Sequence, residues 1–146
     1  MANAPRRADA VWHGTLTKGE GEVSLATSGA GPLPMTWASR TQRSDGKTSP
    51  EELVAAAHAS CFSMALSLIL GEGGTPPDKL ETSATVTFQE IEGGWKVGTS
   101  EITVKGWVPG IDEAAFKKAA EAAKDGCPIS SALKGNVEMS VEATLA

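Results

Sequence analysis

The amino-acid sequence predicts a single α+β domain over residues 1–146, with mostly antiparallel strands and two main helices. Three observations lead to this fold class. The length of 146 residues suits one domain. A hydrophobic content of 40% beside 21% charged residues indicates a packed core. Several segments alternate apolar and polar residues, as strands do, while two others begin with helix-capping residues.

The first part of the chain is expected to be extended. Strands over 11–17 and 22–27 flank a glycine-rich corner, which favours a hairpin. We expect a loop over 28–34, a third strand over 35–41 and then a polar loop over 42–48.

A strong helix start follows this loop. Ser49 can cap the helix, Pro50 suits its first turn, and Glu52 completes a capping box three residues after the cap. The helix should run to Leu70 and end at Gly71.

The rest of the chain mixes strands and helices. A turn at residues 93–94 joins two strands, Asp112 caps a second helix, and Gly126 should end it. The predicted elements, in order, are strands over 82–91 and 95–107, a helix over 113–124, a helical turn over 127–133 and a strand over 137–145.

Composition excludes several classes of function. A formal net charge of −5 leaves no basic face for nucleic acid. Two cysteines and two histidines suit neither a Cys-rich zinc site nor a disulfide-dense secreted scaffold. Arg6 and Arg7 precede no apolar segment, so we predict no secretory signal and expect a cytoplasmic protein.

Residues 53–70 contain no charged side chain. Their length would suit a membrane span, but His58 and several serines lie inside the segment. We therefore expect a helix that is buried on all sides, with no membrane partner. One small sheet covers only one side of such a helix, so the sequence predicts a homodimer with this helix at or near its centre.

The two thiols are the candidate reactive groups. Cys61 lies in mid-helix on an apolar stripe, and Cys127 precedes Pro128. Either alone is typical of a packing residue, but the pair favours redox chemistry. Because burial raises the pKa of a thiol, a reactive Cys61 needs a nearby cation, for which Arg40, Arg43 and His58 are candidates.

Other functions compete with this interpretation. His58 precedes Cys61 by three residues, so the two form a conceivable hydrolase pair, although no third group or oxyanion site is apparent. A buried, hydrogen-bonded histidine is the favoured interpretation. The chain could also be a redox sensor or small-molecule-binding dimer without turnover, or Cys61 could serve packing alone.

Glu51 begins the central helix. Ten residues separate it from Cys61, which is about 15 Å along one helix, so it cannot touch that thiol. In a dimer with antiparallel central helices, the partner subunit's Glu51 could reach the thiol or orient an arginine that does. The alternative is that Glu51 is an ordinary acidic residue whose charge favours the N-terminus of its helix.

Several segments of the sequence resemble a known family. The run over 49–68 looks like the central helix of the osmotically inducible protein C (OsmC) and organic hydroperoxide resistance (Ohr) proteins. The runs over 108–112 and 126–130, and Trp12 with Gly14, are similar to that family too. Residues 57–64 look closer to the OsmC branch.

The resemblance implies a thiol peroxidase of the EC 1.11.1 class, built as an intertwined homodimer with two active sites at the subunit interface. Cys61 matches the peroxidatic cysteine, Cys127 the resolving cysteine and Glu51 the carboxylate that holds the activating arginine. Arg40 is the best match for that arginine because it ends a predicted strand, and Arg43 is the alternative.

The implied chemistry uses thiols alone, with no cofactor and no metal. Cys61 would reduce an organic hydroperoxide, form a disulfide with Cys127 and be restored by an external dithiol, with a lipoyl-type dithiol as one candidate donor. We expect an apolar pocket lined by Phe62 and Met64 to favour organic hydroperoxides over hydrogen peroxide.

Overall fold

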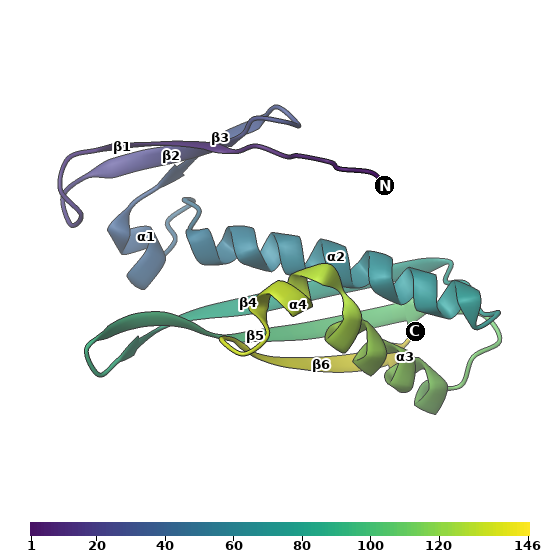
Figure 1. Ribbon diagram of the computed structural model, residues 1–146. Helices are drawn as coiled ribbons and strands as arrows, with labels where there is room; N and C mark the ends of the chain where they lie inside the picture. The colour runs from purple at the N-terminus through teal and green to yellow at the C-terminus, as the bar shows by residue number, and fades with distance from the viewer. The chain divides into compact units, whose positions relative to one another are not determined.

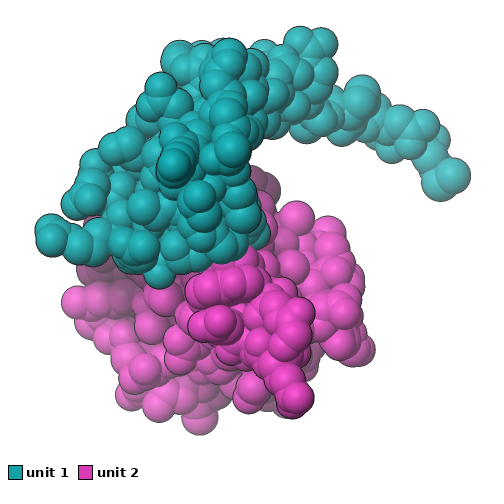
Figure 2. All heavy atoms as spheres, turned by 90° about the vertical axis from the view of Figure 1, so that its left-hand side faces the viewer, with its two compact units in different colours: residues 1–50 teal, residues 51–146 magenta.

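The computed structural model describes residues 1–146 and divides into two compact units. Unit 1 covers Met1–Pro50 and unit 2 covers Glu51–Ala146 (Figure 2). The sequence predicts one domain over the residues that the two units cover together.

Unit 1 is built on a small antiparallel sheet (Figure 1). Its strands β1 (Asp9–His13), β2 (Glu20–Leu25) and β3 (Ala30–Met35) are adjacent in that order. The expected hairpin between the first two strands is present, with His13 opposite Glu20. Both strands begin two residues earlier than predicted.

The predicted strand over 35–41 is wrong, and so is the predicted loop over 28–34. The third strand is β3, and the chain then enters a short helix, α1 (Trp37–Thr41). The prolines of β3 suggest a loop, but an edge strand tolerates them because one side of its backbone has no partner strand. A capping box starts α1: the Ser39 N–H donates to Thr36 Oγ1 at 3.0 Å, and the Thr36 N–H donates to Ser39 Oγ at 2.9 Å.

Unit 2 combines a long helix with a second three-stranded sheet, which confirms the α+β class. Its elements are α2 (Pro50–Glu72, whose first residue still belongs to unit 1), β4 (Lys79–Ile91), β5 (Gly94–Trp107), α3 (Glu113–Gly126), α4 (Pro128–Leu133) and β6 (Glu138–Leu145). The sheet order is β4-β5-β6, with β4 and β5 antiparallel and β5 and β6 parallel. The strands are thus mostly, but not all, antiparallel. Gly71 and Gly126 lie inside their helices rather than ending them, a shift of the size usual for helix ends.

One face of this sheet carries the core of unit 2. The buried side chains come from α2, β5, α3 and β6, namely Phe62, Leu66, Leu70, Ile102, Val104, Phe116, Ala120, Ala123 and Ala143. A Cβ at Gly106 would lie only 2.5 Å from the Phe116 ring. A glycine at that position of β5 therefore allows α3 to approach the sheet closely.

The opposite side of α2 stays open in the single chain. Met64 is 71% exposed and Leu68 is 61% exposed, although both are large and apolar. The sequence-based expectation that the sheet covers only one side of this helix is confirmed. By length and composition α2 also reaches the range of a membrane span, with 22% of its most apolar stretch buried, a test that core helices of soluble proteins pass as well.

Candidate functional site

Cys127 lies at the junction of two helices. It follows α3 and precedes α4, and its φ of −69° and ψ of 143° are extended rather than helical. Pro128 explains this conformation, because a proline disfavours helical geometry at the residue before it and suits the first turn of the next helix. The Cys127 side chain is fully buried.

Cys61 lies in the middle of α2 and is partly exposed. The Cys127 thiol and the backbone N–H of Ile129 both lie close enough to its thiol to shift its pKa. The fold thus brings together two cysteines that are 66 residues apart in the sequence, and both are free thiols.

The surroundings of Cys61 favour the neutral thiol. Burial raises its pKa above the ordinary value, and the neighbouring Cys127 thiol raises it further. The Ile129 N–H lowers the pKa but does not offset the other two effects. A thiolate at neutral pH therefore needs a positive group in addition to these neighbours.

His58 is held by two serines. Its Nδ1 lies 2.6 Å from Ser100 Oγ on β5, and its Nε2 lies 2.8 Å from Ser130 Oγ on α4. The histidine is fully buried, and burial lowers its pKa. The expectation of a buried, hydrogen-bonded histidine is confirmed. Because serines occupy both ring nitrogens, the arrangement gives no support to a Cys61–His58 hydrolase pair.

Ser130 also contacts the second cysteine. Its Oγ lies 3.0 Å from Cys127 Sγ, and its backbone N–H donates to the same sulfur at 3.3 Å. A continuous series of contacts thus runs from Ser100 through His58 and Ser130 to Cys127, and from there to Cys61.

Sequence reasoning missed the two serines. Ser100 shares the buried face of β5 with Ile102 and Val104, so the alternation of that strand already places a hydroxyl in the core. Ser130 follows Cys127 by three residues. At the start of a helix, the residue three positions after the N-cap contacts the N-cap side chain. The alternation of β5 and the three-residue spacing from Cys127 are therefore the sequence patterns that indicate these two serines.

The two candidate arginines differ in their surroundings. Arg40 is not at the end of a strand, as predicted, but in the last turn of α1, because the capping box described above starts a helix at Trp37. Its guanidinium lies 5.9 Å from the centre of the Trp37 ring. By contrast, the Arg43 side chain is 89% exposed, with its Nε 3.7 Å from Asp45 Oδ1.

Arg40 also lines a cavity within unit 1. The cavity has a volume of about 280 Å³, and its remaining lining is mostly apolar, from Trp12, Leu16, Met35, Thr36, Trp37 and Pro50. Glu51 lies in the first turn of α2 and is 5% exposed.

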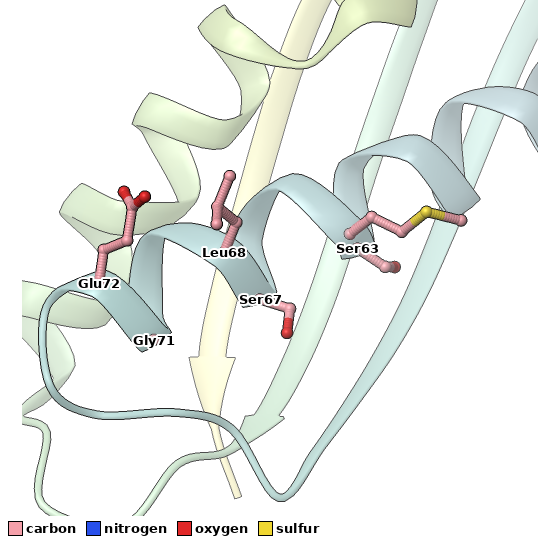
Figure 3. Close-up of a pocket in the computed structure, with 6 residues that line it drawn as sticks. Ser63, Ser67, Leu68, Gly71 and Glu72 are labelled. Carbon is pink, nitrogen blue, oxygen red and sulfur yellow. The ribbon is translucent and has the colours of Figure 1, made fainter. Parts of the chain in front are cut away.

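The pocket predicted around Phe62 and Met64 is wrong for Phe62. That ring is fully buried in the core of unit 2, because it lies on the sheet-facing side of α2. Met64 instead borders an open hollow of about 700 Å³ (Figure 3). All its lining residues come from α2: Ser63, Met64, Ser67, Leu68, Gly71 and Glu72.

The chemistry available at this site is that of two neighbouring free thiols. Such a pair can alternate between two thiols and one disulfide, which is a two-electron redox couple. No group of three or more histidine, cysteine or acidic side chains is placed to hold a metal ion.

Comparison with known proteins identifies similar chains. The family model described as OsmC-like protein matches residues 43–142. Peroxiredoxin OsmC of Escherichia coli (strain K12) is 37% identical over 134 residues, covering 92% of this chain and 93% of the relative. Organic hydroperoxide resistance protein OhrB of Bacillus subtilis (strain 168) is 29% identical over 136 residues, covering 91% and 98%. The crystal structure of OhrB of Bacillus subtilis matches with a TM-score of 0.74 at 26% identity, covering 94% of this chain and 98% of that chain.

Proposed function

Because the chain belongs to the OsmC family, we propose that it is a Cys-based peroxidase that reduces organic hydroperoxides to alcohols, and hydrogen peroxide less efficiently. The names of its relatives, peroxiredoxin OsmC and organic hydroperoxide resistance protein, support a peroxide-detoxifying function. The observation that carries the proposal is the proximity of Cys61 and Cys127, since these are the only two cysteines in the chain.

The first step is the attack of Cys61 on the peroxide. Its thiolate takes the distal oxygen and its hydrogen from R–O–OH, the O–O bond breaks, and the departing alkoxide takes up the proton that the thiol released on ionising, which gives the alcohol. Cys61 is left as a sulfenic acid. Its partial exposure suits this role, whereas Cys127 is fully buried and less accessible to a peroxide.

The second step joins the two cysteines. Cys127 attacks the sulfenic sulfur, water leaves, and a Cys61–Cys127 disulfide forms. An external dithiol then reduces the disulfide by exchange, and a lipoyl-type dithiol is the candidate donor. Because the cycle returns two free thiols, we place the protein in a reducing compartment, the cytoplasm.

Arg40 is the proposed activating cation, with Glu51 as the carboxylate that holds it. The raised pKa of Cys61 is the reason that such a cation is needed. Among the two candidate arginines, Arg40 lines an apolar cavity while Arg43 is exposed beside Asp45. The cavity beside Arg40 is mostly apolar and suits an aliphatic group, for which each buried CH₂ contributes about 0.8 kcal/mol.

The proposed enzyme is a homodimer. Met64 and Leu68 form an exposed apolar face on α2. Covering this face removes apolar surface from water and so stabilises the protein. A second copy of the chain is the proposed cover.

Substituting Leu68 tests the dimer. The wild-type protein is expected to show twice the chain mass of 15.0 kDa in light scattering at low micromolar concentration. Leu68→Glu should shift the mass to that of one chain, because a buried carboxylate without a partner opposes association. Ile91→Glu is the control, since Ile91 is an apolar residue that is 42% exposed at the end of β4 rather than on α2. A wild-type monomer, or a dimer that survives Leu68→Glu, would contradict this assignment.

A turnover assay tests the function itself. With excess dithiothreitol, the protein should consume many equivalents of cumene hydroperoxide or tert-butyl hydroperoxide per chain, and hydrogen peroxide more slowly. Replacing dithiothreitol by dihydrolipoamide should sustain the rate, whereas glutathione, a monothiol, should not. Consumption of one equivalent followed by arrest would indicate a redox sensor instead of an enzyme.

A further inference from the structure

The proposed mechanism leaves one buried titratable group without a role. His58 is fully buried, carries no charged partner and yet engages both of its ring nitrogens. Burial is the only cause that shifts its pKa, and the shift is downward, so the ring is neutral at neutral pH. A neutral imidazole has one nitrogen that donates and one that accepts.

The contacts around His58 permit one continuous direction of hydrogen bonding. Nδ1–H can donate to Ser100 Oγ at 2.6 Å, which leaves Nε2 as the acceptor. The Ser130 hydroxyl then donates to Nε2 at 2.8 Å, and its oxygen can accept the Cys127 thiol proton at 3.0 Å. Every group in this series has a partner, as buried polar groups require.

We propose that Ser130 and His58 form a proton relay for the resolving step, in which Ser130 takes the proton of Cys127 while His58 accepts the proton of Ser130. This inference rests on the function proposed above and deepens it. Ser130 touches the reacting sulfur, whereas His58 is a positioning residue that acts through Ser130 and carries the proton during the step. Ser100 fixes the orientation of the ring.

The step balances as a condensation. The Cys127 sulfur forms a bond to the Cys61 sulfur, and the S–O bond of the sulfenic acid breaks. The Cys127 proton moves to Ser130 Oγ as the Ser130 proton moves to His58 Nε2. The departing hydroxide takes up the proton that the imidazolium releases, so that the products are one disulfide and one water and His58 returns to its neutral form.

Four parts of unit 2 contribute the groups that surround the relay. The sheet contributes Ser100 from β5, helix α4 contributes Ser130, and the junction of α3 and α4 contributes Cys127. Cys61 belongs to α2, the helix that carries His58. No carboxylate or ammonium group shifts the pKa of His58, so the two thiols are the titratable groups of the relay besides the imidazole itself.

The attack of Cys127 can be measured without peroxide. The reagent 5,5′-dithiobis-(2-nitrobenzoate) should react first with partly exposed Cys61 and release one equivalent of thionitrobenzoate. Attack of Cys127 on the resulting mixed disulfide releases a second, coloured equivalent. The rate of this second phase reports the nucleophilicity of Cys127 directly.

Two variants remove the relay in different ways. Ser130→Ala deletes the hydroxyl but keeps the backbone N–H that donates to Cys127 Sγ. His58→Gln keeps an amide near Ser130 but cannot accept a proton. In both, the second phase at pH 7 should be about 10²-fold slower than in the wild type, the size of a general-base contribution. Ser131→Ala, at an exposed position of the same helix, is the control and should match the wild type.

The pH profile separates a relay from a packing effect. Without an internal base, the attack depends on the free thiolate, so the rate of each variant should rise about tenfold per pH unit and approach the wild-type rate in alkali. A variant that keeps the wild-type rate at pH 7, or one that stays slow in alkali, would overturn the relay. If the wild type passes this assay but consumes no organic hydroperoxide, the proposed function fails and the relay stands.

Discussion

Replacing Cys61 by serine is expected to abolish peroxide consumption. The serine hydroxyl is nearly the same size as the thiol, so the helix should be preserved, but it does not ionise at neutral pH and is a poor nucleophile. Cumene hydroperoxide should disappear no faster than in buffer with dithiothreitol alone, and circular dichroism should report an unchanged fold. Turnover by the Cys61→Ser protein at the wild-type rate would contradict the assignment of this sulfur as the peroxidatic one.

Cys127→Ser is the matched variant, because the second sulfur acts only after the first. Without reductant this protein should consume one equivalent of hydroperoxide and then stop, with the sulfenic acid of Cys61 trapped by dimedone in mass spectrometry. The wild type should instead yield the Cys61–Cys127 disulfide. Disulfide formation requires the two sulfurs to come together, and Cys127 is already a near neighbour of Cys61.

The sequence predicts the elements of unit 2 well, because their signals are local. The cap at Asp112 is present, with its carboxylate accepting from the Ala115 N–H at 2.7 Å. The alternation of the last strand also places Ala143 in the core, as the pattern indicates. The parallel pairing of β5 with β6 was not predictable, since alternation fixes the faces of a strand but not its partner or direction.

The candidate site shows the same division between local and long-range information. The contact between Cys61 and Cys127 depends on packing across 66 residues, and only the family resemblance pointed to their pairing. The same packing brings Ser100 and Ser130 to His58. The error at Arg40 has a local cause, because the hydrogen bonds between Thr36 and Ser39 start a helix there, although a serine at this position is a weaker sequence signal than the glutamate that follows Ser49.

Arg40→Gln is expected to slow the oxidation of Cys61 by about 10²- to 10³-fold at pH 7, the loss typical of removing one electrostatic stabiliser. The sign follows from the pKa of Cys61, which burial already raises. Without a cation to counter this shift, the thiol stays protonated at neutral pH, and the rate should recover as the pH rises and the thiolate forms. Single-turnover kinetics of sulfenic acid formation, measured between pH 6 and 9, would follow this effect.

Arg43→Gln provides the matched control for this experiment. Its guanidinium is exposed and lies beside Asp45, so this variant should keep both the wild-type rate and the wild-type pH profile. The opposite result, with Arg43→Gln slow and Arg40→Gln normal, would move the activating role to Arg43. A slow Arg40→Gln protein that alkali does not rescue would show that Arg40 orients the peroxide without lowering the pKa of Cys61. The pH profile therefore distinguishes the two contributions that a cation can make to the attack of a partly buried thiol on a peroxide.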